Sequence, residues 1–256
     1  MTNARVRSTP ALLEVRDLAK SFGALRASDG IEFDVMEGET HAVIGPNGAG
    51  KTTFISQLSG DLRPDRGTIR FAGEDVTALR APARSRRGFA RSFQITSIYR
   101  DMTALDNVAL AVQAHAGHSF RFWAPARREP SLREPARKCL EEVGLGERAN
   151  VLAANLAHGE QRQLEVAMAL ATRPRLLLLD EPVAGMGIEE SQRMVQFLAS
   201  LKGRQSMILV EHDMDAVFSL ADRISVLVYG RIIATGTPQE IRANADVRKA
   251  YLGEDA

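Results

Sequence analysis

A glycine-rich segment, GPNGAGKTT at Gly45–Thr53, constrains the fold of this 256-residue chain more than any other stretch. It follows a short apolar run, HAVI, and precedes a segment of helical spacing, KTTFISQLSG, that ends at a glycine. The segment fits the pattern G-x-x-x-x-G-K-[S/T], in which glycines let successive backbone N–H groups turn inward toward phosphate oxygens. The helix that follows adds the positive end of its dipole. We therefore expect a strand, a phosphate-binding loop and a helix, rather than an incidental glycine turn.

The residue types within the loop indicate how a nucleotide binds. Lys51 supplies a mobile cation for the β- and γ-phosphates, and the Thr52 hydroxyl can bind Mg²⁺. The expected nucleotide-binding residues of the loop are Gly45, Pro46, Asn47, Gly48, Ala49, Gly50, Lys51, Thr52 and Thr53.

A second segment, RLLLLDEP, places two carboxylates at the end of an apolar run. Four leucines predict a buried central strand, and a carboxylate buried at its end, Asp180, requires a cation or hydrogen bonds. We expect Mg²⁺ as that cation, bound through Thr52 or water. Glu181 comes next and is predicted to polarise a water toward the γ-phosphate, with a helix-capping charge as the alternative.

Composition limits the class of protein. Hydrophobic residues make up 45% and charged residues 25% of the chain, which predicts a packed globular core. The formal net charge of +1 gives no whole-molecule attraction to nucleic acid, and the single cysteine allows no internal disulfide. The longest apolar run is far shorter than the roughly 20 residues of a membrane span, so we expect any membrane role to come through a partner.

Strands alternating with helices predict an α/β fold with a mainly parallel sheet. The segment at 11–22 shows the alternation of an edge strand, and 67–77 and 223–236 resemble hairpins, the first in an antiparallel β subdomain. Residues 97–170 are mostly of helical character. We therefore predict a single domain over 1–256, with a helical subdomain inserted at approximately 97–170.

Three isolated residues carry weaker signals. Gln94 lies where the sheet core gives way to the helical segment, and its amide could touch Mg²⁺ or water, although a surface glutamine is the plainer alternative. His212 ends an apolar strand, where a structural histidine is more common. Phe22 could stack on adenine or belong to the core.

Taken together, these residues resemble the ATP-binding subunit of ABC transporters, and the resemblance spans nearly the whole chain. The shared order is an aromatic residue, the phosphate loop, a glutamine loop, a signature segment, the acidic strand and a switch histidine. In this chain the signature comprises Leu156, Ala157, His158, Gly159 and Glu160. The resemblance implies catalytic roles for Glu181, His212, Lys51 and Gln94, adenine contact by Phe22, and Mg²⁺ binding by Thr52, Gln94 and Asp180.

The resemblance also implies that the protein works in pairs. In the family, the signature of one subunit closes over ATP held by the phosphate loop of the other, through N–H groups at the start of a helix. The expected partners are a second ATPase subunit, identical or a sibling, membrane-spanning permease subunits and, indirectly, a solute-binding protein. The implied location is the cytoplasmic face of the inner membrane, reached through the permease subunits.

This chain departs from the usual Leu-Ser-Gly-Gly-Gln signature in two informative places. Ala157 lacks the serine hydroxyl that would donate to the γ-phosphate, a bond worth roughly 1.5–3 kcal/mol. Glu160 places a carboxylate where an amide is usual, and we expect it to face ribose hydroxyls or to pair with Arg162. Gly187 also replaces a usual acidic residue. From these departures we hypothesise an asymmetric pair, in which the ATP facing Ala157 is hydrolysed more slowly.

The segments LAHGEQRQLEVAMAL and LLLLDEPVAGM and the closing GTPQEIRANADVRKAYLGEDA resemble the ATPases of branched-chain amino acid importers. ATPases of lipopolysaccharide export and of urea or amide import share some of these features and stay open as alternatives. Phe120, Phe122 and Trp123, near basic residues, could contact lipid or the membrane partner, or fold back on the helical segment.

Overall fold

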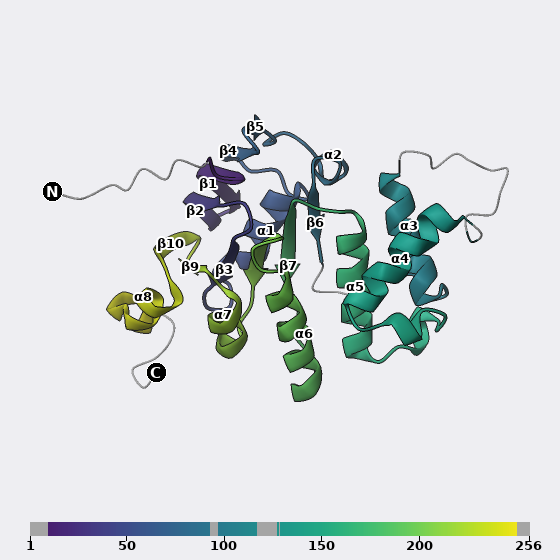
Figure 1. Cartoon of the computed structure of the whole chain (residues 1–256). Coiled ribbons are helices and arrows are strands. Elements are labelled where there is room, and N and C mark those ends of the chain that lie inside the picture. The colour runs from purple at the N-terminus through teal and green to yellow at the C-terminus, as the bar shows by residue number, and fades with distance from the viewer. Residues whose placement is uncertain (1–9, 93–96, 117–126, 128, 250–256) are drawn as a thin grey trace.

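The computed structural model describes residues 10–92, 97–116, 127 and 129–249. Two β-sheets lie side by side at one end of the molecule, and a group of helices extends from the other end (Figure 1). Among the described residues, no helix is both long enough and apolar enough to cross a membrane.

The larger sheet has six strands in the order β10-β9-β3-β8-β7-β6. Its strands are β3 (Thr40–Ile44), β6 (Phe89–Arg91), β7 (Leu176–Asp180), β8 (Ser206–Val210), β9 (Arg223–Val228) and β10 (Arg231–Gly236). All neighbours are parallel except β9 and β10, which form an antiparallel hairpin. The mainly parallel sheet predicted from the sequence is thus confirmed. Because β3, β7 and β8 are parallel neighbours, the loops that follow them lie at the same edge of the sheet.

The smaller sheet has four antiparallel strands in the order β2-β1-β4-β5. Its strands are β1 (Leu13–Phe22), β2 (Leu25–Val35), β4 (Arg66–Phe71) and β5 (Glu74–Asp75). The prediction of an edge strand at 11–22 is wrong, because β1 pairs with both β2 and β4. One face of β1 is buried and the other partly exposed, and this alternation does not distinguish an edge strand from a central one.

The six-stranded sheet separates two hydrophobic clusters. Alternate residues of β3, β7 and β8 point to opposite faces, as the two-residue period of a strand requires. On one face they pack with α1 (Lys51–Ser59) and the four-stranded sheet. On the other face they pack with α5 (His158–Ala171), α6 (Ile188–Leu201) and α7 (Met214–Leu220). Helix α1 is therefore held between the two sheets.

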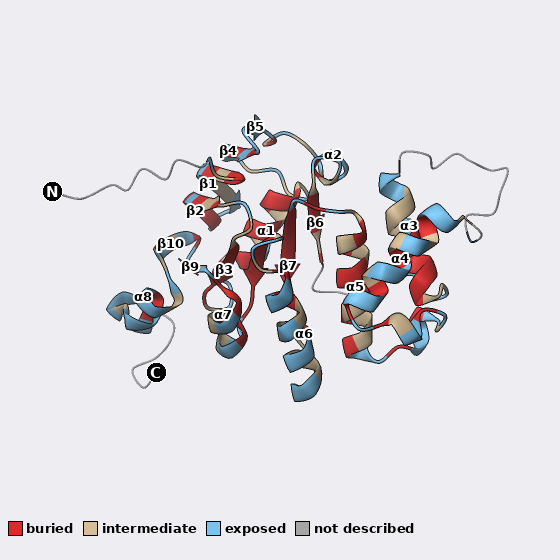
Figure 2. Ribbon diagram, viewed as in Figure 1, coloured by how far each residue is buried: buried red, intermediate tan, exposed pale blue. Residues whose placement is uncertain are grey.

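A third hydrophobic cluster joins α3 (Ala104–His115), α4 (Pro130–Glu142) and α5. These helices lie beside one another away from the sheets, with their buried residues facing inward (Figure 2). Helix α5 also contributes Val166 and Ala169 to the cluster on the sheet, so it belongs to both packing units. The subdomain limits at 97 and 170 remain a prediction.

Other short elements are α2 (Ala81–Ser85), α8 (Pro238–Ala243), α9 (Ala245–Val247) and the 3₁₀ turns Gly146–Arg148 and Ala153–Asn155. Arg84 of α2 is fully buried and donates to the carbonyl oxygens of Gln57 and Leu58 at 2.7 and 2.6 Å. These carbonyls belong to the end of α1, where intrahelical donors run out. A buried guanidinium therefore completes the helix that follows the glycine-rich loop.

Candidate nucleotide site

The predicted phosphate loop joins β3 to α1, as the sequence indicated. Gly50 precedes the helix with φ of 107°, and a Cβ there would lie 2.1 Å from the carbonyl oxygen of Ala27. At Gly45 a Cβ would lie 2.0 Å from the carbonyl oxygen of Leu227. Only glycine fits these two positions, because β2 and β9 approach the loop so closely. The first turn of α1 contains no acidic residue, so the positive end of its dipole is not neutralised there.

The side chain of Lys51, the first residue of α1, contacts the backbone of the phosphate loop. Its Nζ donates to the carbonyl oxygens of Gly45 at 2.6 Å and Pro46 at 3.1 Å. Burial lowers the pKa of the Lys51 ammonium, while the nearby carboxylates of Glu181 and Asp180 act in the opposite direction. The charges of Glu181 and Asp180 thus favour the protonated form of Lys51.

Asp180 is 2% exposed at the end of β7, and the cation that the structure places beside it is a guanidinium. Arg91 Nη2 donates to Asp180 Oδ2 at 3.1 Å. Burial raises the pKa of the Asp180 carboxyl, and the charge and hydrogen bond of Arg91 oppose that rise. Among the described residues the hydrogen bond and ion pair of this carboxylate both use Oδ2.

Glu181 and His212 come from the loops that follow β7 and β8. The Glu181 backbone adopts φ of 51°, a left-handed conformation that is uncommon for a residue with a side chain. Its Oε1 lies 3.8 Å from His212 Nδ1, and His212 is 60% exposed. Two side chains for which separate catalytic roles were predicted therefore lie close together, with the imidazole exposed to solvent.

Glu211 is a residue of this site that the sequence analysis missed. Its carboxylate is 1% exposed and accepts hydrogen bonds from the backbone N–H groups of Val183, His212 and Asp213 at 3.0 to 3.4 Å. Burial raises the pKa of Glu211 despite these three donors. The carboxylate joins the loop after Glu181 to the loop that contains His212. An acidic residue at the end of an apolar strand, LVEH, was the available signal.

Phe22 lies at the end of β1, opposite Leu25 in the hairpin with β2, and is half exposed. It does not belong to the core, which was the plainer alternative. Lys20 Nζ lies 5.7 Å from the centre of its ring. Strand β2 approaches the phosphate loop at Ala27, so Phe22 belongs to a hairpin that borders the loop.

The signature segment starts helix α5. His158 is the first helical residue, Ala157 is the N-cap without a side-chain hydrogen bond, and Leu156 is buried. Gly159 lies close against α6, since a Cβ added to it would lie 2.7 Å from the Glu190 carboxylate. His158 lies against Gly185, in the loop after β7. The segment therefore packs beside the region that follows Glu181.

Of the two contacts expected of Glu160, the ion pair with Arg162 is wrong, and the contact with ribose hydroxyls stays a prediction. Its Oε2 accepts from the Ala157 backbone N–H at 2.9 Å, and its Oε1 pairs with Arg148 at 2.9 Å. Arg162 pairs instead with Glu165 at 3.1 Å. Residues two apart in a helix point to different faces, whereas residues three apart are neighbours, which explains why Arg162 pairs with Glu165 and not with Glu160.

Gln94 lies outside the described residues, as do Phe120, Phe122 and Trp123 of the aromatic insertion. Arg91, three residues before Gln94, was not singled out from the sequence. The only signal was a charged residue at the end of a short strand, and its partner Asp180 lies 89 positions away.

Known proteins are similar in sequence to almost the full length of this chain. The family model described as "ABC transporter" matches residues 28–184, and one described as "Branched-chain amino acid ATP-binding cassette transporter" matches residues 231–256. The high-affinity branched-chain amino acid transport ATP-binding protein BraF of Pseudomonas aeruginosa is 42% identical over 95% of this chain and 98% of its own. The corresponding LivG of Escherichia coli is 38% identical with the same coverage.

Solved structures of ATP-binding cassettes also match the fold of this chain. A nucleotide-free ATP-binding cassette from an ABC transporter matches with a TM-score of 0.83 and 28% identity, over 96% of this chain and all of the other. A cassette structure described as an ADP conformation matches equally well. The fold, the order of motifs and these relatives show that this chain belongs to the ABC transporter family and carries its ATPase cassette.

Proposed function

We propose that this chain is the ATP-hydrolysing subunit of an importer of branched-chain amino acids. Two relatives at 42% and 38% identity are named for branched-chain amino acid transport. The observation that carries the substrate class is the match of residues 231–256 to the branched-chain amino acid cassette, because this segment lies outside the general ABC match at 28–184. The chain acts at the cytoplasmic face of the membrane, bound to permease subunits.

ATP binds at the phosphate loop, with its phosphates against the loop N–H groups and the start of α1. Lys51 exchanges its contacts with the Gly45 and Pro46 carbonyls for phosphate oxygens. Glu181 accepts the proton of the attacking water, and His212, at 3.8 Å from that carboxylate, holds the γ-phosphate and Glu181 in one arrangement. Phe22 provides an exposed ring for the adenine base.

The residues present suit Mg²⁺. Magnesium usually keeps several waters and takes one or two carboxylates together with substrate phosphates, so a dense cluster of acidic ligands is not required. Asp180 Oδ1, the exposed Thr52 hydroxyl and Gln94 are the residues that would hold it. When bound, the ion neutralises charge that develops on the β- and γ-phosphates.

A second ATPase subunit, identical or a sibling, completes each site in trans. The signature segment of this chain then faces the γ-phosphate held by the partner. It comprises Leu156, Ala157, His158, Gly159 and Glu160. The Ala157 N–H already donates to Glu160, so the backbone N–H groups of His158 and Gly159 at the start of α5 are offered to that phosphate. Ala157 adds no hydroxyl, so the site that this chain completes in trans is the slower one. Glu160 is already engaged with Arg148, which limits repulsion between its carboxylate and the phosphate.

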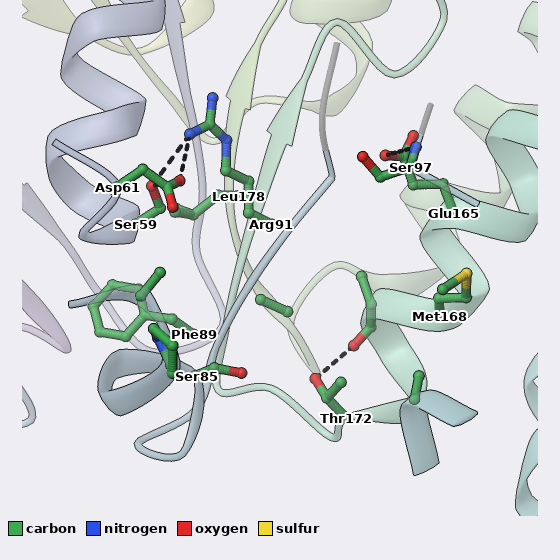
Figure 3. Close-up of a pocket in the computed structure, with 15 residues that line it drawn as sticks. Ser59, Asp61, Ser85, Phe89, Arg91, Ser97, Glu165, Met168, Thr172 and Leu178 are labelled. Atoms are coloured by element: carbon green, nitrogen blue, oxygen red, sulfur yellow. Dashed lines mark hydrogen bonds and ion pairs between the residues drawn. The ribbon is translucent and has the colours of Figure 1, made fainter. Parts of the chain in front are cut away.

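The membrane partner docks in a groove of about 360 Å³ between the sheet and the helical region. Its wall is largely apolar, with Phe89, Leu178 and Met168 from β6, β7 and α5 (Figure 3). Arg91 and Ser97 also line it, and these two residues flank Gln94 in the sequence. A short permease segment seated there is in a position to sense the glutamine loop.

Reconstitution in proteoliposomes with the permease subunits and solute-binding protein encoded beside this chain tests the proposal. Leucine, isoleucine or valine should raise ATP turnover and accumulate inside, and Glu181→Gln should abolish both. Stimulation by urea or short amides alone, or by lipopolysaccharide, would support one of the alternative systems instead.

A further inference from the structure

Arg91 connects two elements that each supply half of the nucleotide site. Its Nη1 donates to Ser56 Oγ at 3.1 Å, Ser59 Oγ at 3.2 Å and Asp61 Oδ2 at 3.0 Å, all at or just beyond the last turns of α1. Its Nη2 donates to Asp180 Oδ2 at 3.1 Å, at the end of β7. Figure 3 shows the side chain reaching from β6 toward Ser59 and Asp61.

These contacts join the two elements that carry the proposed Mg²⁺ ligands. Helix α1 begins with Lys51 and Thr52, and β7 ends with Asp180. The proposed Mg²⁺ ligands Thr52 and Asp180 therefore belong to separate elements, whose relative position sets the distance between the ligands. Magnesium requires near-ideal octahedral geometry, so it tolerates little variation in that distance.

The chemistry of the side chain suits a fixed bridge. A guanidinium is planar and presents several donors in a rigid fork, whereas an ammonium is a single mobile point of charge. The Arg91 side chain is 10% exposed and Asp180 2%, so water screens this contact weakly. The bridge links the buried Asp180 carboxylate directly to the end of α1.

We propose that Arg91 is a positioning residue that fixes the Asp180 carboxylate relative to α1, so that Asp180 and Thr52 can bind one divalent cation together. This inference rests on the proposed function, because it concerns the Mg²⁺–ATP complex. A plain structural ion pair is the competing role, in which Arg91 only neutralises a buried carboxylate. The positioning role predicts that substitution of Arg91 weakens nucleotide binding more with Mg²⁺ than without it, whereas the structural role predicts equal weakening.

The test measures how strongly Mg²⁺ improves nucleotide binding. In the full chain carrying Glu181→Gln, which prevents turnover, the Kd of a fluorescent ATP analogue is measured with Mg²⁺ and with EDTA at constant ionic strength. Arg91→Gln should reduce the ratio of the two Kd values by about ten-fold, while the Kd in EDTA changes by less than about two-fold. Arg91→Lys should recover part of the ratio, because it restores the charge without the fork.

Two further variants sharpen the result. Asp61→Asn leaves Arg91 in place but removes its charged partner next to α1, and should reduce the ratio by about three-fold. Arg87→Gln is the matched control, since Arg87 is partly exposed, pairs with Glu74 and should leave the ratio unchanged. If Arg91→Gln does not fold, Arg91→Lys and Asp61→Asn decide the matter.

The outcomes separate this inference from the function on which it rests. An unchanged ratio in Arg91→Gln, or equal weakening with and without Mg²⁺, overturns the positioning role and leaves the ATPase proposal standing. A parent chain that is folded but binds no nucleotide contradicts the proposed function itself.

Discussion

The phosphate loop and the signature segment both lead into a helix, α1 and α5, and neither helix has a side-chain hydrogen bond from its N-cap. The first turn of α1 contains no acidic residue, whereas the first turn of α5 contains Glu160, whose carboxylate already accepts the Ala157 N–H. A free helix N-terminus attracts a phosphate, and one already capped by a carboxylate attracts it less. We therefore predict a strong anion site at the start of α1 and a weaker one at the start of α5, the second facing a nucleotide held by a partner.

The largest expected effect concerns the carboxylate of the chain's own site. Glu181→Gln should lower ATP turnover by about 10²–10⁴-fold while nucleotide still binds, because the amide cannot accept a proton from water. Turnover and nucleotide Kd are measured on the same reconstituted assembly. Glu189→Gln is the control, since Glu189 is exposed at the start of α6 and should behave like the parent. Loss of binding and turnover together would show a structural role for Glu181.

The cation of the phosphate loop comes next. Lys51→Met should weaken ATP binding by about ten- to a hundred-fold, because a hydrogen bond between charged groups is lost. Isothermal titration with a slowly hydrolysed analogue measures it. Lys202→Met serves as the control, since Lys202 pairs with Asp222. Equal binding by Lys51→Met and the parent would contradict the assignment of the loop.

Acid should affect stability through the strand that leads into the phosphate loop. His41 of β3 is 1% exposed, stacks on Phe33, and burial lowers its pKa from 6.5 to about 3. The unfolded chain binds the proton more readily, so this stabilisation is present above pH 6.5 and is lost as the pH falls toward 3. The free energy of unfolding should fall by up to about 1.4 kcal/mol per pH unit within that window.

Denaturant titrations at several pH values check this dependence. His41→Gln should flatten the slope, although it lowers the overall stability because the ring's packing is lost. His115→Gln, at an exposed position, should keep the slope of the parent. An unchanged slope in His41→Gln would show that another group is responsible.

The smallest expected effect tests the weaker site directly. Ala157→Ser supplies the missing hydroxyl, and should raise ATP turnover of the assembly by up to about ten-fold. The same substitution creates a capping box with Glu160, worth about 1 kcal/mol of stability. Ala154→Ser, at an exposed position just before the signature, controls for the added hydroxyl. A gain in melting temperature without any gain in turnover would show that the hydroxyl was not limiting.

The parts of the site that could be predicted are local in sequence. Gly45 to Thr53 dictates a loop by its glycines, and the leucines before Asp180 dictate a buried strand. The contacts of Arg91 and Glu211 could not be predicted, because they join residues that only the strand order brings together. The same limit explains the wrong assignment of β1 as an edge strand, since pairing on both sides depends on β4, some 50 residues later.

The pairing of Glu160 was open to better prediction. Helix geometry alone excludes a close contact with Arg162, because side chains two positions apart diverge. Arg148, the actual partner, comes from a 3₁₀ turn before α5 and required the packing of the helical region.

The central claim is that the start of α5 serves ATP held by another subunit. It is tested most directly by solving the structure of the reconstituted assembly with Glu181→Gln, ATP and Mg²⁺. The claim predicts that the backbone N–H of His158 or Gly159 of this chain lies within hydrogen-bond distance of a γ-phosphate bound to the opposite subunit's phosphate loop. A nucleotide whose phosphates contact only the subunit that binds it, with α5 of the other chain turned away, would contradict the claim.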